Sequence, residues 1–158
     1  MSNDMIARAL PRGLPTLMVA TDLGFIVYWL ITAAHLLPAA WLYNDSTNPM
    51  MIDWNWSFLA IDLMVSLTGF LTLTTARRDP MAARSLALVS LTLTSASGLM
   101  AISFWTLRHD FDPAWWGPNS FLLLYPLPYL FALIRTQRPE SAARRSARAS
   151  EDAEAKPT

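Results

Sequence analysis

The chain has 158 residues, of which 53% are hydrophobic and only 15% are charged, and its mean hydropathy is +0.28. This composition is too apolar and too poor in charge for an ordinary soluble domain, so it indicates a membrane protein. The formal net charge is zero and no basic stripe is present, which argues against a nucleic-acid partner. The absence of cysteine excludes disulfides, thiolate zinc sites and thiol nucleophiles.

Four segments are long enough to span a bilayer, because a spanning helix needs about 20 mainly apolar residues. We expect helices over residues 15–37, 54–76, 85–107 and 118–134. Arg8 and Arg12 precede the first segment, but it is too long for a signal peptide and contains Asp22, so we expect an uncleaved helix. The last segment contains Pro126 and Pro128 and is expected to kink. The predicted fold class is all-α: a polytopic membrane protein with a bundle of four transmembrane helices.

Positive charge gathers on one side of the predicted helices, namely at Arg8, Arg12, Arg77, Arg78, Arg84, Arg135, Arg138, Arg144, Arg145, Arg148 and Lys156. The opposite side has only Arg108, beside several aspartates and most of the tryptophans, which are typical of the headgroup region. The positive-inside rule therefore places both termini in the cytoplasm. We expect a cytoplasmic segment at 1–14, a transmembrane domain at 15–137 and a disordered cytoplasmic tail at 138–158, which has almost no large apolar residue.

Polar side chains form stripes on three of these helices. On the second helix the stripe contains Asn55, Asp62, Ser66 and Gly69, at about 100° per residue. On the first it contains Thr21, Gly24, Tyr28, Thr32 and His35, with Asp22 roughly 100° away, on a face with Trp29. On the third it contains Ser90, Thr94, Ser97 and Ala101. Small residues of this kind are typical of tight packing inside a helix bundle.

The two aspartates within the helices lie at different predicted depths. At 1.5 Å per residue, Asp62 is about 5 Å to the outer side of the midplane and Asp22 about 6 Å to the inner side, so we do not expect a carboxylate dyad. We expect a cluster that opens outward past His35 and contains Asp62, Tyr28, Tyr125, Asn55 and Thr32.

An aspartate ion at this depth costs about 3 kcal/mol or more, so Asp62 must be protonated or bonded to donors. Such acids commonly mark functional sites, but Asp62 can equally join two helices by hydrogen bonds. The joining role is the stronger alternative for Asp22, because Thr21 and small residues nearby offer partners. His35 lies near an interface, where a headgroup-level or capping role is more typical than a ligand or base.

Metal and cofactor sites are not predicted. The chain has only two histidines, His35 and His109, and they do not form a ligand pair, so a zinc or haem site lacks its ligands. No Gly-rich phosphate loop and no Gly-x-Ser-x-Gly elbow is present.

Several motifs, TDLGFIVYWLIT, HLLP, LYNDSTNP and WNWSFLAIDLMVSLTG, are followed by a fourth helix rich in Tyr and Pro. Over about residues 16–135 this succession resembles the YvaD-type family of small bacterial four-helix membrane proteins. That family has no known function, so the resemblance implies a topology and a bacterial inner membrane.

A more distant resemblance is to the EXPERA superfamily, which includes sterol isomerases and the sigma-2 receptor. It lies in LLPAAWLY, WSFLAIDL and the Pro-Tyr-Leu run of the fourth helix. The resemblance implies a membrane-embedded cavity faced by Asp62. The acid expected in the first helix falls near Thr32, and the histidine and glutamate set of the isomerases is missing.

We therefore predict that the protein binds a small hydrophobic or amphiphilic molecule in an intramembrane pocket around Asp62, within the lipid bilayer. One alternative is an integral-membrane isomerase or cyclase with Asp62 as general acid. Another is a non-catalytic subunit that associates with itself or with a membrane partner. The sequence leaves open whether any reaction is catalysed.

Overall fold

The computed structural model describes residues 9–135, so the predicted tail at 138–158 lies outside the described residues. The helices are α2 (Leu14–Ala33), α3 (Ala39–Leu42), α4 (Pro49–Ser57), α5 (Leu59–Thr75), α6 (Pro80–Leu107) and α7 (Pro113–Leu124). After a turn residue at Tyr125, helix resumes over residues 126–135, where Pro126 and Pro128 lie. The part of the chain that the structure describes contains no strand.

Four spans are long and apolar enough to cross a membrane: Leu14–Ala33, Pro49–Thr75, Pro80–Leu107 and Pro113–Arg135. They confirm the predicted all-α class and the four spanning helices. Large apolar side chains on their outer surfaces are exposed, among them Leu30, Leu63 and Leu124. A soluble protein would bury most of such a surface, whereas a membrane protein presents it to lipid.

Three spans begin at a proline that follows a capping residue. Asn48, Asp79 and Asp112 each accept a hydrogen bond from a backbone N–H of the first turn. A side-chain cap followed by proline is a strong start signal for a helix. The spans therefore begin at residues 49, 80 and 113, ahead of the limits at 54, 85 and 118 that the apolar runs predicted.

The helices α2 and α6 end in the same way. His35 and His109 have φ angles of 51° and 55°, in the left-handed region. The His35 N–H donates to the Thr32 carbonyl and the Leu36 N–H to that of Ile31, and His109 repeats the pattern. This is a Schellman motif, which ends α2 at Ala33, before the predicted limit at 37. Both histidines of the chain thus occupy helix-terminating positions.

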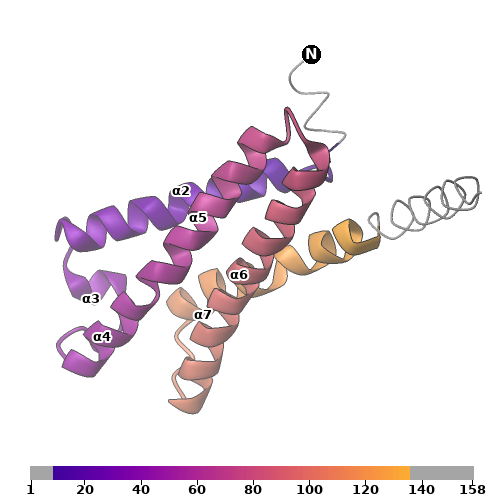
Figure 1. The fold of residues 1–158 in the computed structure, drawn as a ribbon. Coiled ribbons are helices and arrows are strands. Elements are labelled where there is room, and N and C mark those ends of the chain that lie inside the picture. The colour runs from indigo at the N-terminus through magenta and orange to yellow at the C-terminus, as the bar shows by residue number, and fades with distance from the viewer. Residues whose placement is uncertain (1–8, 136–158) are drawn as a thin grey trace, which may run out of the picture.

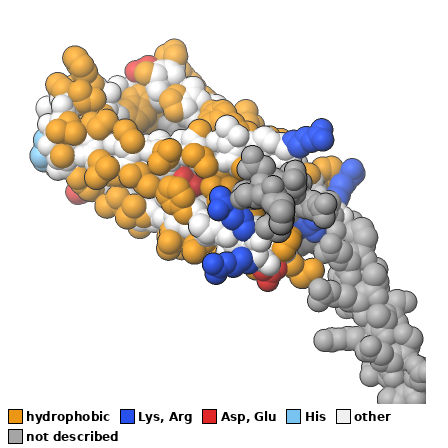
Figure 2. All heavy atoms as spheres, turned by 90° about the horizontal axis from the view of Figure 1, so that it is seen from above, with side chains coloured by type: hydrophobic (Ala, Val, Ile, Leu, Met, Phe, Trp, Pro, Cys, Tyr) orange, Lys and Arg blue, Asp and Glu red, His pale blue; other side chains and the backbone are white. Residues whose placement is uncertain are grey.

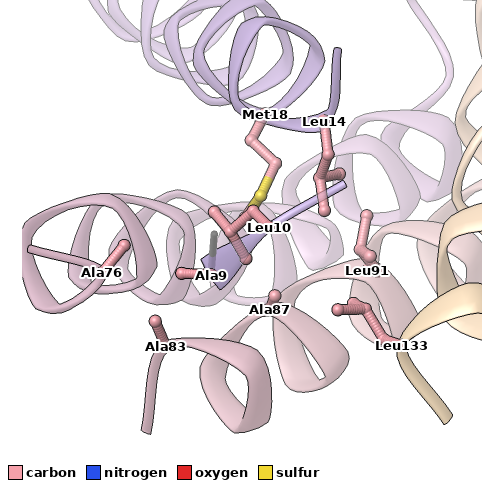
Figure 3. Packing of buried hydrophobic residues seen from close by; sticks show 9 residues of the cluster. All are labelled: Ala9, Leu10, Leu14, Met18, Ala76, Ala83, Ala87, Leu91 and Leu133. Carbon is pink, nitrogen blue, oxygen red and sulfur yellow. The ribbon is translucent and has the colours of Figure 1, made fainter. Parts of the chain in front are cut away.

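The helices pack in the order α2, α5, α6, α7, each antiparallel to the next (Figure 1). At the end near the chain termini they meet in a buried apolar cluster (Figure 3), whose members are Ala9, Leu10, Leu14, Met18, Ala76, Ala83, Ala87, Leu91 and Leu133. Among the described helices, no comparable packing joins α2 to α7. The opposite half of the bundle is therefore less closely filled, and the candidate site lies there.

Charge is distributed unequally between the two ends. In Figure 2 the Lys and Arg side chains gather toward one end of the visible face, and a histidine lies at the opposite end. Arg108 belongs to that opposite end, where its guanidinium lies 3.8 Å from the Asp45 carboxylate. This asymmetry is the basis of the predicted orientation, and which end faces the cytoplasm stays a prediction.

Candidate functional site

A cavity of about 590 Å³ lies between α2 and α7, with α4, α5 and α6 behind it and α3 beside it. Its aromatic lining consists of Phe25, Tyr28, Trp29, Trp41, Trp54, Phe58, Trp115 and Phe121. This volume falls within the roughly 300–1,000 Å³ that is usual for small-molecule sites. The cavity is thus large enough for a small molecule and offers it a mainly apolar surface, much of it aromatic.

Asp62 lies on α5 with only 4% of its surface exposed, and it lines the cavity. Its Oδ2 atom accepts a hydrogen bond of 3.0 Å from the Trp29 indole N–H. Its Oδ1 atom accepts one of 3.1 Å from the Ser97 hydroxyl. The carboxyl group therefore joins three helices through neutral donors. Since a carboxylate can accept about four hydrogen bonds, it keeps acceptor capacity for a further group.

Asn55 lies on α4, also 4% exposed, in the wall of the same cavity. Its Oδ1 atom accepts a hydrogen bond of 2.6 Å from the Tyr28 hydroxyl. Its Nδ2 atom is buried and has no hydrogen-bond partner among the described residues. A buried polar group without a partner costs roughly 1–3 kcal/mol. This amide nitrogen can recover that cost from an acceptor on a bound molecule.

Of the other residues predicted for this cluster, Thr32 lies beside Tyr28 and His35 lies farther out, and neither lines the cavity. Thr32 is buried, but its hydroxyl donates to the Tyr28 carbonyl of its own helix at 2.8 Å. His35 is exposed at the end of α2. Neither residue lines the cavity, whereas Tyr28, Asn55 and Asp62 do.

Tyr125 also lies apart from Asp62. It packs against the apolar cluster at the terminal end of the bundle, and its ring stacks on Phe121 with centroids 4.8 Å apart. Its hydroxyl lies beside Thr21 and Thr94, at the level of Asp22. The structure therefore brings together three members of the predicted cluster and separates Tyr125 from them.

Asp22 is 1% exposed and faces α5. A Cβ atom added to Gly69 would lie 2.6 Å from its Cγ, so the carboxyl group fits against a glycine. The Ser66 hydroxyl donates to the Asp22 backbone carbonyl at 3.2 Å, while the carboxyl Oδ2 has no hydrogen-bond partner among the described residues. Asp22 thus belongs to a helix contact and does not line the cavity.

The contacts of Asp22 with Gly69 and of Trp29 with Asp62 belong to one register. Asp22 and Trp29 are seven residues apart on α2, and Asp62 and Gly69 are seven residues apart on α5. Seven residues make two helical turns, or about 10 Å. The two carboxyl groups therefore lie at different levels of the antiparallel pair. The spacing points to Trp29 as the partner of Asp62 only once the contact of Asp22 with Gly69 is known, and that contact comes from the packing of the helices.

The described residues contain no group of three or more His, Cys, Asp or Glu side chains that could hold a metal ion. At the cavity, Asp62, Asn55 and their neighbours offer hydrogen bonds, and the lining offers aromatic contact.

Comparison with known proteins places the chain in a family. The model of a "Family of unknown function (DUF5360)" matches residues 14–140. The chain is also similar to "Uncharacterized protein YvaD" of Bacillus subtilis (strain 168), with 42% identity over 127 residues, which cover 80% of this chain and 96% of that relative. No solved structure matches the chain. The resemblance to the YvaD-type family is confirmed, and the one to the EXPERA superfamily stays a prediction. The chain belongs to the family of unknown function DUF5360.

Proposed function

We propose that this membrane-embedded protein binds a small hydrophobic or amphiphilic molecule in the cavity around Asp62. The observation that carries the proposal is the unpartnered amide nitrogen of Asn55 in the wall of a cavity lined mainly by apolar side chains, many of them aromatic. We place the protein in a bacterial inner membrane on the basis of its similarity to a Bacillus protein, and both termini in the cytoplasm on the basis of the charge of its connections.

Two kinds of surface in the cavity contribute to binding, namely apolar walls and a few polar groups. Aromatic and aliphatic walls supply most of the affinity, because the removal of apolar surface from water contributes about 25 cal/mol per Å². Asn55 selects a ligand that presents an acceptor, because Tyr28 occupies its amide oxygen. Asp62 receives a donor or a cationic group through its remaining lone pairs. The ligand that fits has an apolar body with one polar end.

The enzyme alternative requires a second acid or base at the same cavity. Asp112 is the other acidic residue in its lining, and its side chain is already engaged. Its Oδ1 atom caps α7 by accepting from the Ala114 N–H at 2.9 Å, and its Oδ2 atom accepts from Asn44 at 3.3 Å. Binding therefore needs fewer groups than catalysis would, and this favours the binding proposal.

The partner-subunit alternative needs an exposed helix face of small residues, such as the one on the third span. Ser90, Thr94, Ser97 and Ala101 are all buried in the described chain. Ser90 and Ser97 donate to α5, which shows that the face contacts other helices of the same chain. It is therefore not free to receive a second protein.

The binding proposal can be tested by filling the cavity. Gly24 lines it, and a Cβ atom added there meets nothing within 4 Å. We expect Gly24→Leu and Asp62→Asn to lose a discrete adduct that the gently solubilised wild type retains in native mass spectrometry. Lipid extraction and fragmentation of that adduct would identify the ligand.

The matched control is Gly117→Leu. Gly117 also has open space at its Cβ position, but it does not line the cavity. The control should therefore keep the adduct at the wild-type level. The same nonspecific lipid on all four proteins would contradict the proposal and would leave Asp62 with a purely structural role.

A further inference from the structure

A second hollow lies on the opposite half of the molecule, between the start of α2 and the end of α5. It is a groove of about 970 Å³ that does not involve Asp62. The α2 side is formed by Pro15, Thr16, Val19 and Ala20, and the α5 side by Leu73, Thr74 and Thr75. Apart from the threonine hydroxyls, these are apolar side chains, and the residues lie in the first turns of α2 and the last turn of α5. The groove therefore runs along the surface that faces lipid.

Two arginines complete the groove at its end. Arg77 and Arg78 follow directly after α5, in the turn that leads to α6, and both are exposed. Neither forms an ion pair with another described residue. Asp79 is next in the chain, but its Oδ1 atom accepts from the N–H groups of Met81 and Ala82. This neighbouring carboxylate is thus engaged at the start of α6.

We propose that this groove is a binding site for one anionic phospholipid. Arg77 and Arg78 bind the phosphate of the headgroup, and an acyl chain lies along the apolar groove between Val19 and Leu73. The groove shares only Ala20 with the lining of the cavity at Asp62, and the proposal does not depend on whether that cavity binds a ligand.

The chemistry of the groove favours a lipid over a free anion. Guanidinium groups bind phosphate oxygens through paired, charge-assisted hydrogen bonds. Exposed arginines alone would serve any phosphate, but the apolar wall adds affinity only for a molecule with a hydrocarbon chain. Basic pockets between transmembrane helices on the cytoplasmic side are typical sites for anionic headgroups. The predicted orientation places this end of the molecule in the cytoplasmic leaflet.

The test measures lipid preference on the full-length protein by native mass spectrometry. Phosphatidylglycerol and phosphatidylcholine with identical acyl chains are titrated into detergent micelles. Each arginine near a charged headgroup contributes about 1 kcal/mol, so two should favour phosphatidylglycerol by roughly thirty-fold. We expect Arg77→Gln/Arg78→Gln to reduce this preference to under about two-fold. Thermal unfolding of each variant verifies that it remains folded.

The matched control is Arg12→Gln/Arg135→Gln, which removes the same charge at the same end but outside the groove. It should retain the preference. A second variant, Val19→Trp, fills the apolar wall without changing charge and should weaken both lipids. Equal loss in the two double variants would contradict a discrete site and indicate diffuse attraction. Inorganic phosphate that displaces phosphatidylglycerol at micromolar concentration would also overturn the proposal, because the site would then recognise the anion alone.

Discussion

Asp22 shows how a single buried side chain can set the distance between two helices. Its carboxyl group occupies the space that a side chain at position 69 would need, and that position is a glycine. The contact is one of two at the same register of α2 and α5, and the other is the hydrogen bond from Trp29 to Asp62. The two acids therefore have different roles: Asp22 packs against Gly69 at a helix contact, whereas Asp62 accepts hydrogen bonds beside a cavity.

We predict that Gly69→Ala lowers the free energy of unfolding by about 1–3 kcal/mol, because the new Cβ overlaps the Asp22 carboxyl group. Asp22→Ala removes the overlapping atoms. The double variant should therefore lose less stability than the two single changes together. Thermal unfolding in detergent of all four proteins gives the coupling energy. Additive losses would show that the carboxyl group moves away without cost.

The residues of the candidate site were only partly predictable from the sequence. Helical periodicity placed Tyr28, Asn55 and Asp62 on inward faces, and the structure brings them to one cavity. Periodicity says nothing about which helices are neighbours, so it could not show that Tyr125 lies outside the lining of the cavity. Trp29 was missed as a donor, because only the packing of α2 on α5 brings its indole to Asp62.

At the scale of the elements, apolar runs predicted the four spans, whereas polar caps decided where three of them begin. A window of apolar residues excludes Asn48, Asp79 and Asp112, although these residues start the helices. The second span also divides at Phe58 into α4 and α5, a break that no glycine or proline marks in the sequence. Local chemistry thus explains the starts, and we have no physical account of the break.

The contact between α6 and α7 provides a prediction at this scale. A Cβ atom at Gly98 would lie 2.6 Å from the Leu123 nitrogen and 2.7 Å from the Asn119 carbonyl oxygen. These are backbone atoms, so α7 as a whole would have to shift. We expect Gly98→Ala to cost about 1–3 kcal/mol of stability.

Gly24→Ala is the control for that change, because nothing lies within 4 Å of its added Cβ. Alanine has the higher helix propensity, by about 1 kcal/mol, so this variant should be as stable as the wild type or slightly more so. Chemical unfolding in mixed micelles gives the free energy of unfolding of Gly98→Ala and of Gly24→Ala for comparison. Equal stability of both variants would show that α6 and α7 can separate freely.

At the scale of the whole molecule, the orientation in the membrane can be tested because the chain has no cysteine of its own. Thr47→Cys and Met81→Cys introduce single thiols at exposed positions near opposite ends of the bundle. The positive-inside rule predicts that a membrane-impermeant maleimide labels position 47, but not 81, in intact spheroplasts. Both should react after the membrane is permeabilised. Labelling of position 81 alone would show that the protein has the opposite orientation in the membrane.

The weak packing between α2 and α7 has a consequence for how a ligand arrives. Gly24 on α2 and Phe121 on α7 line the cavity and are also exposed on the outer surface of the helices. In a membrane that surface meets hydrocarbon, so a ligand of the proposed site would enter sideways from the bilayer. Its occupancy then depends on the number of ligand molecules per lipid, and not on its concentration in water. Diluting the ligand with extra lipid at constant total concentration would therefore empty the site.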